Sequence, residues 1–383
     1  MKKVRVLSVF GTRPEAIKMA PLVLELGARP GIESIVAVTG QHRQMLDAVL
    51  DLFGIRADYD LNIMQPKQTL YSITSRTLLG MERVLEEAAP DIVLVHGDTS
   101  TTFAGALSAF YAQVPVGHVE AGLRTYDNYS PFPEEMNRRL VGPIAALHFC
   151  PTRANAENLA RESITDGIFI TGNTAIDALK TTVKEDYTFR CAALNAVDFA
   201  RRRVILVTAH RRENYGEPLE NIFMALRALA ENYADVEMVY PVHMSPVVTE
   251  TAKKILGNTE RVHLIPPVDV DDMHNAMARS FMVMTDSGGI QEESPALGKP
   301  VLVLRRETER PEAVRAGTVK IAGVERETIY AMAAELLDRS ESYAAMANAV
   351  NPYGDGAACR RIADAIEWHF GLRTARPEEF SGV

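Results

Sequence analysis

The chain has 383 residues, which is more than one hydrophobic core usually serves, so we expect two domains. Hydrophobic residues make up 47% and charged residues 24%, as in ordinary globular proteins, which excludes disordered and fibrous classes. The formal net charge of -9 argues against nucleic-acid binding through a broad basic face.

The three cysteines, Cys150, Cys191 and Cys359, are too few and too scattered for a disulfide framework or a zinc site with paired cysteines. They predict a reducing compartment, and therefore a cytoplasmic location. The basic N-terminus is not followed by the pattern of a signal peptide. No stretch approaches the roughly 18 apolar residues that span a bilayer, so the sequence predicts a soluble protein with no membrane association.

The first half of the chain alternates short apolar runs with helical patterns. The run from Val4 to Phe10 is rich in β-branched residues and ends at Gly11, and a helical pattern follows from Pro14 to Leu26. Further strands are expected at 34–39, 92–95, 114–119, 146–150 and 168–171, and further helices at 43–52, 101–112 and 135–144. Strands that alternate with helices predict a parallel sheet with helical crossovers.

The second half repeats this alternation after a polar stretch. Strands are expected at 204–208, 236–241, 262–265, 281–285 and 301–304, and helices at 219–232, 247–256, 272–279 and 290–297. The sequence therefore predicts the α/β class, with Rossmann-like, doubly wound domains at 1–177 and 178–354. The segment 355–383 contains a last helix, which could cross back to the N-terminal domain. Because parallel sheets bind ligands at the carboxyl ends of their strands, we expect the active site in a central cleft between the domains.

Two basic residues open the first predicted helix. Arg13 precedes Pro14, which suits the first helical position, and Lys18 falls about one turn later. One interpretation is simply a capped helix start. The other is that free N–H groups at the helix start, together with both cations, bind a diphosphate.

Three carboxylates follow successive strands of the first domain: Asp98, Glu120 and Glu134. Asp98 could be an N-cap and Glu134 could support a helix dipole, so these two have ordinary structural explanations. Glu120 has no comparable explanation. Three such residues at the strand ends of one domain favour a catalytic cluster.

Polar loops also end two strands of the second domain. One loop carries a histidine and two arginines, and the other carries a serine and two glycines that can present N–H groups to phosphate. A carboxylate one turn further on could chelate a ribose diol, and a later arginine supplies another cation. The candidates are His210, Ser287, Gly288, Gly289, Glu293 and Arg310. A structural histidine and a solvated arginine are the plainer alternatives for two of them.

The sequence lacks the common motifs that bind nucleotide cofactors. There is no G-x-x-x-x-G-K-[ST] phosphate loop, and the G-x-G at Gly354 follows no predicted strand, so neither a P-loop nucleotidase nor an NAD enzyme is indicated. The pair Asp269 and Asp271 resembles the metal-binding acidic pair of some glycosyltransferases, but capping of the helix near Asp272 explains it better. We therefore expect no cofactor and no metal.

The loop motifs occur together over nearly the whole chain, from Val4 to about Trp368. They are Phe10-Gly11-Thr12-Arg13-Pro14-Glu15-Ala16-Ile17-Lys18, His96-Gly97-Asp98-Thr99, His118-Val119-Glu120-Ala121-Gly122, Pro133-Glu134-Glu135, His210-Arg211-Arg212-Glu213, Ser287-Gly288-Gly289 and Glu309-Arg310-Pro311-Glu312. In these motifs the chain resembles the non-hydrolysing UDP-N-acetylglucosamine 2-epimerase family.

This resemblance implies a glycosyltransferase-B-like fold, a homodimer and a UDP-sugar substrate. It assigns catalysis to Asp98, Glu120, Glu134 and His210. It assigns binding of the UDP-sugar to Arg13, Lys18, Asp98, Glu120, His210, Val268, Met273, Ser287, Gly288, Gly289, Glu293 and Arg310. Members often carry Phe where Met273 stands, so the packing of uracil beside Val268 is expected to differ.

The resemblance extends to bacterial members in which a second UDP-N-acetylglucosamine binds beside the active-site ligand and promotes domain closure. The corresponding allosteric residues here are Gln41, Gln44, Gln68, Arg211 and His243. Lys67 stands where those members tend to carry Arg, which weakens bidentate phosphate recognition. Polar capping and solvated side chains are the alternative interpretation.

The implied reaction explains the residue types. Carbon 2 of an N-acetylhexosamine has no adjacent carbonyl, so its proton is not acidic. Expulsion of UDP from carbon 1, while a base removes that proton, leaves a 2-acetamidoglucal that can accept UDP and a proton back. The departing diphosphate needs the cations Arg13, Lys18 and Arg310, and the proton needs carboxylates, for which Asp98 and Glu120 are the preferred pair. The product would be a precursor of cell-surface polysaccharide.

Four alternatives share parts of this pattern. A hydrolysing 2-epimerase would release free N-acetylmannosamine, and a related enzyme could act on a UDP-uronic acid derivative. A glycosyltransferase of the same fold would share the UDP loops but need an acceptor groove. A catalytically inactive UDP-sugar sensor would have no need to keep all three carboxylates.

Overall fold

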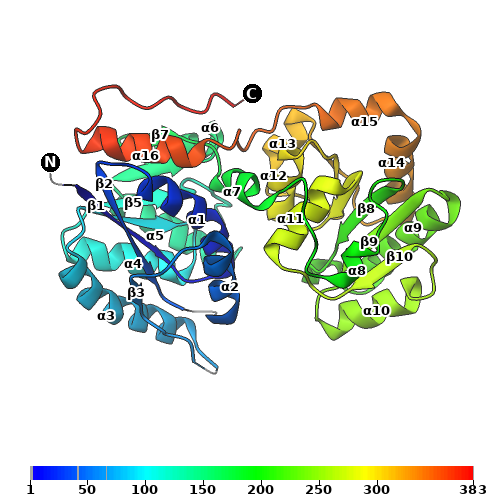
Figure 1. The fold of residues 1–383 in the computed structure, drawn as a ribbon, viewed down its shortest axis with the longest axis horizontal. Helices are drawn as coiled ribbons and strands as arrows, with labels where there is room; N and C mark the ends of the chain where they lie inside the picture. The colour runs from blue at the N-terminus through cyan, green and yellow to red at the C-terminus, as the bar shows by residue number, and fades with distance from the viewer. Residues whose placement is uncertain (1–2, 41–42, 66, 383) are drawn as a thin grey trace. The chain divides into compact units, whose positions relative to one another are not determined.

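The computed structural model describes residues 3–40, 43–65 and 67–382. The chain divides into two compact units, and Figure 1 follows it through them from blue to red. Unit 1 comprises Met1–Thr181 and Tyr353–Gly382, and unit 2 comprises Thr182–Pro352. The chain therefore passes between the units twice.

Unit 1 is built on seven parallel strands in the order β3-β2-β1-β4-β5-β6-β7. The strands are β1 Val4–Phe10, β2 Ile32–Val38, β3 Tyr59–Asp60, β4 Ile92–His96, β5 Val116–Val119, β6 Leu147–Cys150 and β7 Ile168–Ile170. The chain moves outward from β1 to β3 and then returns to the other side of β1. This reversal between β1 and β4 is the arrangement of a doubly wound, Rossmann-like sheet.

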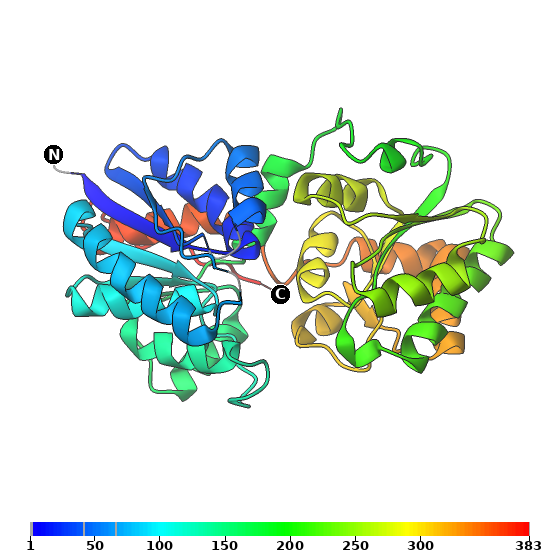
Figure 2. The same cartoon turned by 90° about the horizontal axis from the view of Figure 1, so that it is seen from below.

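Helices cover both faces of this sheet (Figures 1 and 2). They are α1 Arg13–Gly27, α2 Arg43–Phe53, α3 Leu70–Ala88, α4 Ser100–Tyr111, α5 Glu134–Ile144, α6 Arg153–Arg161, α7 Thr174–Thr182 and α16 Ala358–His369. Successive side chains of a strand point to opposite faces of the sheet. In β1, Val6 and Phe10 belong to the core with α1, α2 and α16, whereas Leu7 and Val9 belong to the core with α3 and α4. The strand is apolar apart from Arg5 and Ser8 because both of its faces are buried.

The strands and helices predicted for this half are confirmed, with ends shifted by a few residues. Helices α6 and α7 were not predicted, and neither was helix α3, which has 19 residues. It follows β3, a strand of only two residues, so no clear apolar run precedes the helix in the sequence.

The C-terminal helix α16 packs against α1 in unit 1. Its buried face contributes Ile362, Ala363 and Ile366 to the core that also contains β1. Arg29, which follows α1, forms an ion pair with Asp364 of α16 at 2.9 Å. The end of the chain is therefore part of the first sheet's covering layer.

Unit 2 contains a second parallel sheet, of six strands in the order β10-β9-β8-β11-β12-β13. Its strands are β8 Arg203–Thr208, β9 Val236–Pro241, β10 Val262–Ile265, β11 Met282–Thr285, β12 Val301–Val303 and β13 Val319–Ile321. Its helices are α8 Ala192–Asn195, the 3-10 helix η1 Arg212–Asn214, α9 Glu217–Asn232, α10 Pro246–Leu256, α11 Val270–Arg279, α12 Gly288–Ala296, α13 Pro311–Ala316, α14 Arg326–Asp338 and α15 Ser340–Ala347. The sheet reverses between β8 and β11, so the predicted α/β class with two doubly wound sheets is confirmed.

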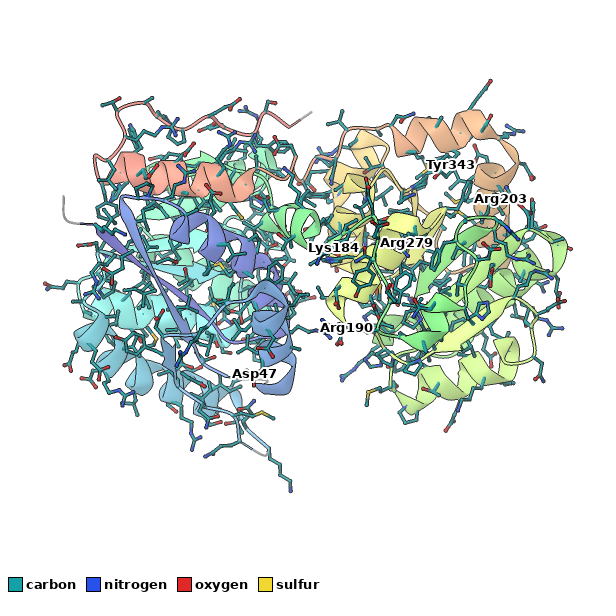
Figure 3. All side chains as sticks on the ribbon, viewed as in Figure 1. Asp47, Lys184, Arg190, Arg203, Arg279 and Tyr343 are labelled. Atoms are coloured by element: carbon teal, nitrogen blue, oxygen red, sulfur yellow. The ribbon has the colours of Figure 1, made fainter. Side chains whose placement is uncertain are left out.

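Arginine and aromatic side chains join distant segments of unit 2. The guanidinium of Arg279 from α11 lies over the ring of Phe189, 5.0 Å from its centroid (Figure 3). The ring of Tyr343 from α15 stacks on Phe281 with centroids 4.3 Å apart, and Arg203 of β8 lies over the same Phe281 ring (Figure 3). These contacts hold the segment after α7 and the helix α15 against the sheet layer.

The described cysteines are free thiols. Cys150 and Cys359 are buried, and burial raises the pKa of both thiols, so neither is suited to act as a nucleophile. Within the described ranges, no helix has the length and apolar character needed to cross a membrane.

Candidate active site

The loops singled out in the sequence lie at the reversal points of the two sheets. In unit 1, Gly11 follows β1 and Gly97 follows β4, the strands between which the sheet reverses. In unit 2, Ala209 follows β8 and Asp286 follows β11 at the equivalent reversal. Open parallel sheets bind ligands at this position, where the loops diverge. Each unit therefore presents its candidate residues at its own ligand-binding edge.

The turn after β1 requires glycine at position 11. A Cβ atom on Gly11 would lie 1.9 Å from Oγ1 of Thr39 and 2.8 Å from Oγ1 of Thr101. The next residue, Thr12, forms a capping box with Glu15, whose carboxylate accepts the N–H groups of Gly11 at 3.1 Å and Thr12 at 2.8 Å. Burial raises the pKa of Glu15, against the effect of these hydrogen bonds. The capped helix start that the sequence suggested is therefore present.

Glu120, directly after β5, is the centre of a polar cluster. Its backbone lies in the left-handed region, with a φ of 63°, which is uncommon for a residue other than glycine. Its Oε1 atom forms an ion pair with Lys18 of α1 and accepts a hydrogen bond from Nδ2 of Asn173 at 2.9 Å. Its Oε2 atom lies 3.5 Å from Nε2 of His96. The structure thus brings together Lys18 and Glu120, which are 102 positions apart in the sequence.

His96 is buried beside Glu120 and is uncharged at neutral pH. Burial lowers the pKa of His96 to about 4, although the charges of Glu120 and Asp98 oppose the shift. The positive charge that faces Glu120 is therefore that of Lys18 rather than that of an imidazolium. His118 of β5 is also buried, with Nε2 at 2.7 Å from the carbonyl oxygen of Gly97, and burial lowers its pKa to about 3.

Asp98 is held by an arginine and does not cap a helix. The N-cap of α4 is Thr99, so the capping interpretation of Asp98 is wrong. Instead, Arg138 of α5 contacts Oδ2 of Asp98 through Nε at 2.8 Å and through Nη2 at 2.6 Å. Nη1 of the same guanidinium lies 3.1 Å from the buried carboxylate of Glu135. The Asp98 side chain keeps an exposed fraction of 25%, so it is oriented and still accessible.

The other two predicted residues of unit 1 are less enclosed. Arg13 is exposed at the first position of α1, and Glu134 is half-buried at the first position of α5. In the ion pairs of the described residues, Arg138 meets Glu135 rather than Glu134. Glu134 therefore stands next to the Asp98 network without being the carboxylate that anchors it.

In unit 2 a buried aspartate orders the loop after β8. Oδ2 of Asp286 accepts the backbone N–H groups of His210 and Arg211, each at 2.7 Å, and the side chain of Asn214 at 3.2 Å. Nδ1 of His210 lies 3.4 Å from Oδ1 of Asp286. Burial lowers the pKa of His210, against the charge of Asp286. The half-buried His210 ring stacks on His243 with centroids 5.4 Å apart.

The predicted phosphate-binding loop forms the start of α12. The helix begins at Gly288, and Ser287 occupies its N-cap position. A Cβ atom built on Gly288 would lie 3.9 Å from Nη2 of Arg211 and 3.9 Å from Nη2 of Arg310. Arg310 is oriented by an ion pair with the buried Glu292. N–H groups of a first helical turn beside two guanidinium groups form a site suited to an anion.

The remaining predicted residues of unit 2 lie around α11 and α12. Oε2 of Glu293, one turn into α12, is 3.7 Å from Nε2 of the buried His274. Nδ1 of His274 is 2.7 Å from Oγ1 of Thr182. Val268 and Met273, the expected neighbours of uracil, are half-buried just before α11 and in its first turns.

The acidic residues at the start of α11 have structural roles. Asp269 occupies the N-cap position as expected, although its side chain forms no capping hydrogen bond. Asp271 pairs with Arg190 at 3.1 Å, and Asp272 accepts the N–H group of Cys191 at 2.8 Å. Among the residues that the structure describes, no group of three or more His, Cys, Asp or Glu is placed to hold a metal ion.

The residues predicted for a second ligand belong to both units. Gln41 lies outside the described residues, as does the side chain of Gln44. Gln68 is half-buried just before α3 in unit 1. Arg211 and His243 lie in unit 2, where Nε of Arg211 is 3.3 Å from the carbonyl oxygen of Asp286 and His243 stacks on His210.

Several polar residues of these clusters were not predicted. Three of them lie inside or next to the recognised sequence motifs: His96, Glu135 and Arg138. Their short sequence distance from Asp98 and Glu134 could have identified them as site residues. Asn173 gave no such signal, because a Thr-Gly-Asn-Thr stretch after a strand is typical of an ordinary helix start.

The two Rossmann-like sheets, each with charged loops at its reversal point, define an α/β protein of the glycosyltransferase-B-like class. Residues 24–367 match the family model described as UDP-N-acetylglucosamine 2-epimerase. A Bacillus subtilis protein named UDP-N-acetylglucosamine 2-epimerase is 57% identical over 383 residues, which cover 100% of both chains. The chain belongs to the UDP-N-acetylglucosamine 2-epimerase family.

Solved structures of relatives agree over the same length. A protein from S. aureus, solved in a co-structure with UDP, is 50% identical with a TM-score of 0.89 and coverage of 100% of both chains. The UDP-GlcNAc 2-epimerase from Neisseria meningitidis bound to UDP-GlcNAc is 50% identical with a TM-score of 0.86, and the match covers 95% of this chain and 99% of that one. The similarity therefore includes both units and every predicted site loop.

Proposed function

We propose that this chain interconverts UDP-N-acetylglucosamine and UDP-N-acetylmannosamine by inverting carbon 2 of the sugar. Its relatives are named for 2-epimerase activity, and two of them were solved with UDP or with UDP-GlcNAc. The observation that carries the proposal is the ion pair of Lys18 with Glu120, next to Gly97 and Asp98 at the reversal point of the first sheet. A cation and two oriented carboxylates are what removal of a diphosphate and a carbon-bound proton requires.

The UDP moiety is proposed to bind the loops of unit 2. The first turn of α12, with its two neighbouring guanidinium groups, is suited to the diphosphate. Glu293 would accept the ribose hydroxyls, and the half-buried Val268 and Met273 would pack against uracil. The proposed ligands of the nucleotide are Ser287, Gly288, Gly289, Glu293, Arg310, Val268 and Met273. Arg13 and Lys18 of unit 1 would add positive charge to the same diphosphate.

The first chemical step is an elimination. The bond between carbon 1 and the UDP oxygen breaks, and its electron pair leaves with UDP. A carboxylate takes the carbon 2 proton, and the electrons of that bond form the double bond of 2-acetamidoglucal. Negative charge grows on the diphosphate as the bond breaks, so cations placed beforehand lower the barrier.

The second step reverses the first with one change. The proton returns to the opposite face of carbon 2, and UDP returns to carbon 1, so the sum of reactants and products balances without water. Two groups on opposite faces are needed, and we propose Asp98 and Glu120 for them, with Glu134 and His210 in support. Each carboxylate has its own cation, because Arg138 contacts Asp98 and Lys18 pairs with Glu120.

The proposed reaction is non-hydrolysing. The motifs around Asp98, Glu120 and Glu134 support this subtype, because they are the ones in which the chain resembles the non-hydrolysing enzymes. A hydrolysing enzyme would release free N-acetylmannosamine and consume the UDP-sugar irreversibly. A reversible epimerase in the cytoplasm would supply the activated sugar for the synthesis of cell-surface polysaccharide.

The experiment that tests the proposal is incubation with UDP-N-acetylglucosamine in deuterated water, followed by NMR of the products. The expected result is deuterium at carbon 2 of both epimers with UDP still attached. Free N-acetylmannosamine would support the hydrolysing alternative. Epimerisation without deuterium at carbon 2 would contradict the elimination route.

A further inference from the structure

We infer that Asn173 is a positioning residue for this reaction, which orients the Glu120 carboxylate and ties it to the segment through which the chain re-enters unit 1. The inference rests on the proposed function. Asn173 lies between β7 and α7 and is 3% exposed. It is neither a charged residue nor one of the residues that the motifs indicated.

The hydrogen bonds of the Asn173 side chain leave its amide one orientation. Its Oδ1 atom accepts the backbone N–H group of Ala175 at 2.9 Å, a contact that only a carbonyl oxygen can make. Its Nδ2 atom donates to Oε1 of Glu120 at 2.9 Å, a contact that only the NH2 group can make. Each contact therefore excludes the flipped amide. The side chain caps α7 with one end and holds the carboxylate with the other.

The backbone of Asn173 is held by the second crossing between the units. Its N–H group donates to the carbonyl oxygen of Tyr353 at 2.7 Å, and Tyr353 is the first residue of the returning segment. The next residue, Gly354, has a φ of 151°, in the region that favours glycine, and a Cβ atom there would lie 3.4 Å from the Asn173 nitrogen. The returning chain therefore lies directly against the turn that carries Asn173.

Two more contacts fasten this segment to α7. The carboxylate of Asp177 accepts the N–H groups of Ala358 at 3.1 Å and Cys359 at 2.9 Å, which belong to the start of α16. Nζ of Lys180 donates to the carbonyl oxygen of Gly356 at 2.6 Å. The turn before α7, the helix itself and the returning segment thus form one hydrogen-bonded assembly within unit 1.

Lys18 and Asn173 act on the same oxygen of Glu120 in different ways. Lys18 supplies charge through a side chain with four rotatable bonds, so it follows the carboxylate wherever it moves. Asn173 is buried and is held by Tyr353 and Ala175 independently of Glu120, so it defines where Oε1 must be. Because a displacement of about 1 Å at a reacting group costs about 10²-fold in rate, the fixed donor sets the catalytic geometry.

Two substitutions separate the cap from the contact with Glu120. Asn173→Asp and Asn173→Ser both keep an oxygen that can cap α7, since Asp and Ser are as good as Asn at this position. Asn173→Asp replaces the amide donor by a second carboxylate, whereas Asn173→Ser replaces it by a shorter hydroxyl and adds no charge. Asn155→Asp is the matched control, because Asn155 is a buried residue whose Oδ1 accepts the N–H group of Thr152 at 3.1 Å at the start of α6.

Three quantities are measured for each variant as a function of pH: kcat, KM and the midpoint of thermal unfolding. At pH 8 we expect Asn173→Asp to lower kcat by about 10²-fold with KM changed by less than about 3-fold, because two carboxylates face each other. As the pH falls to about 5.5, the introduced carboxyl takes up a proton and can again donate to Glu120, so its kcat relative to wild type should rise about 5-fold or more. Asn173→Ser should lose about 10-fold at every pH, and Asn155→Asp should keep wild-type kcat.

The outcomes are distinguishable. The inference would be overturned if Asn173→Asp kept the wild-type kcat and pH profile. It would also be overturned if both Asn173 variants lost the same fraction of kcat at every pH, because a purely structural cap would give that result. The thermal midpoint gives a readout independent of activity: relative to Asn173→Ser, Asn173→Asp should gain stability as the pH falls, because protonation relieves its repulsion with Glu120. A midpoint difference that does not change with pH would also overturn it. The proposed function itself is decided by the wild-type protein alone, in the deuterium experiment.

Discussion

Arg138 contacts the Asp98 carboxylate through two guanidinium nitrogens, at 2.8 Å and 2.6 Å, and reaches buried Glu135 with a third at 3.1 Å. Both nitrogens meet the same oxygen, Oδ2, so the guanidinium holds that oxygen by two charge-assisted hydrogen bonds while Glu135 helps to hold the guanidinium. Asp98 is therefore oriented before any substrate binds.

We expect Asp98→Asn and Glu120→Gln each to lower turnover by about 10²-fold or more while UDP affinity is retained, because each change removes a proposed proton-transfer group and keeps the shape. Steady-state kinetics gives the turnover, and calorimetric titration with UDP gives the affinity. Asp166→Asn, at an exposed position, is the control and should behave as wild type. Near-wild-type turnover in either variant would show that its proton-transfer role is wrong.

The buried histidines predict a loss of stability in acid. An unfolded histidine binds a proton below its ordinary pKa of 6.5, whereas burial keeps folded His118 neutral until a pH of about 3. Unfolding therefore takes up a proton in this range, and the free energy of unfolding falls as the pH falls from 6.5.

His118→Gln should reduce this acid sensitivity, because a glutamine can still donate to the Gly97 carbonyl and does not titrate. Between pH 7 and 4.5 we expect the variant to lose roughly 3 kcal/mol less unfolding free energy than wild type, because about two pH units lie between the unfolded pKa of 6.5 and pH 4.5. Urea unfolding at the two pH values measures the difference. An identical loss in both proteins would mean that His118 titrates normally when folded.

Turnover should not depend on a metal or on NAD. In the proposed mechanism Arg13, Lys18 and Arg310 supply the charge that a divalent cation would otherwise supply to the diphosphate. Activity is therefore expected to survive EDTA and to need no added NAD, in a coupled assay for UDP-N-acetylmannosamine. Loss of turnover with EDTA and its recovery with a divalent cation would contradict the mechanism.

The protein is expected to be a homodimer that associates through α3 and α4. These helices expose three large apolar side chains: Leu79 (69%), Phe110 (59%) and Tyr111 (67%). A hollow of about 690 Å³ is lined in part by Leu79 and Tyr111. Exposed apolar side chains that gather around a hollow favour an interface with another chain. Sedimentation should give about twice the chain mass of 42.2 kDa, and the double substitution Leu79→Asp with Tyr111→Asp should give the monomer. Met244→Asp, an 81% exposed position in unit 2, should leave the dimer intact.

Regulation by a second substrate molecule is expected from Gln41, Gln44, Gln68, Arg211 and His243. A ligand that binds only one conformation shifts the equilibrium by its differential affinity. The rate against UDP-N-acetylglucosamine should then be sigmoidal, and UDP-N-acetylmannosamine alone should react poorly until a trace of the other epimer is added.

The matched variants for this prediction are Gln44→Ala and Gln113→Ala, of which the second is exposed between α4 and β5. Gln44→Ala should make the rate curve hyperbolic, whereas Gln113→Ala should leave it sigmoidal. Hyperbolic curves for wild type in both directions would show that this chain lacks the regulatory site.

The class of fold and the loops that carry the site could be predicted from local sequence patterns. Apolar runs followed by amphipathic helices predict parallel sheets because both faces of each strand are buried, and this pattern is local in the chain. Where the pattern was weak, at the two-residue strand β3, the helix after it was missed. The loops after the strands were recognisable because glycines and charged residues interrupt apolar runs there.

Which side chains meet could not be predicted in the same way, because it depends on the folded arrangement of distant segments. Lys18 and Glu120 are 102 positions apart, Asp98 and Arg138 are 40 apart, and Asn173 reaches Glu120 over 53 positions. Contacts between residues so far apart in the sequence depend on strand order and on how the helices pack on the sheet, and no local pattern encodes either. For the same reason Asp98 looked like a helix cap in sequence, although Thr99 takes that role and the Asp98 carboxylate is free to meet an arginine from another helix.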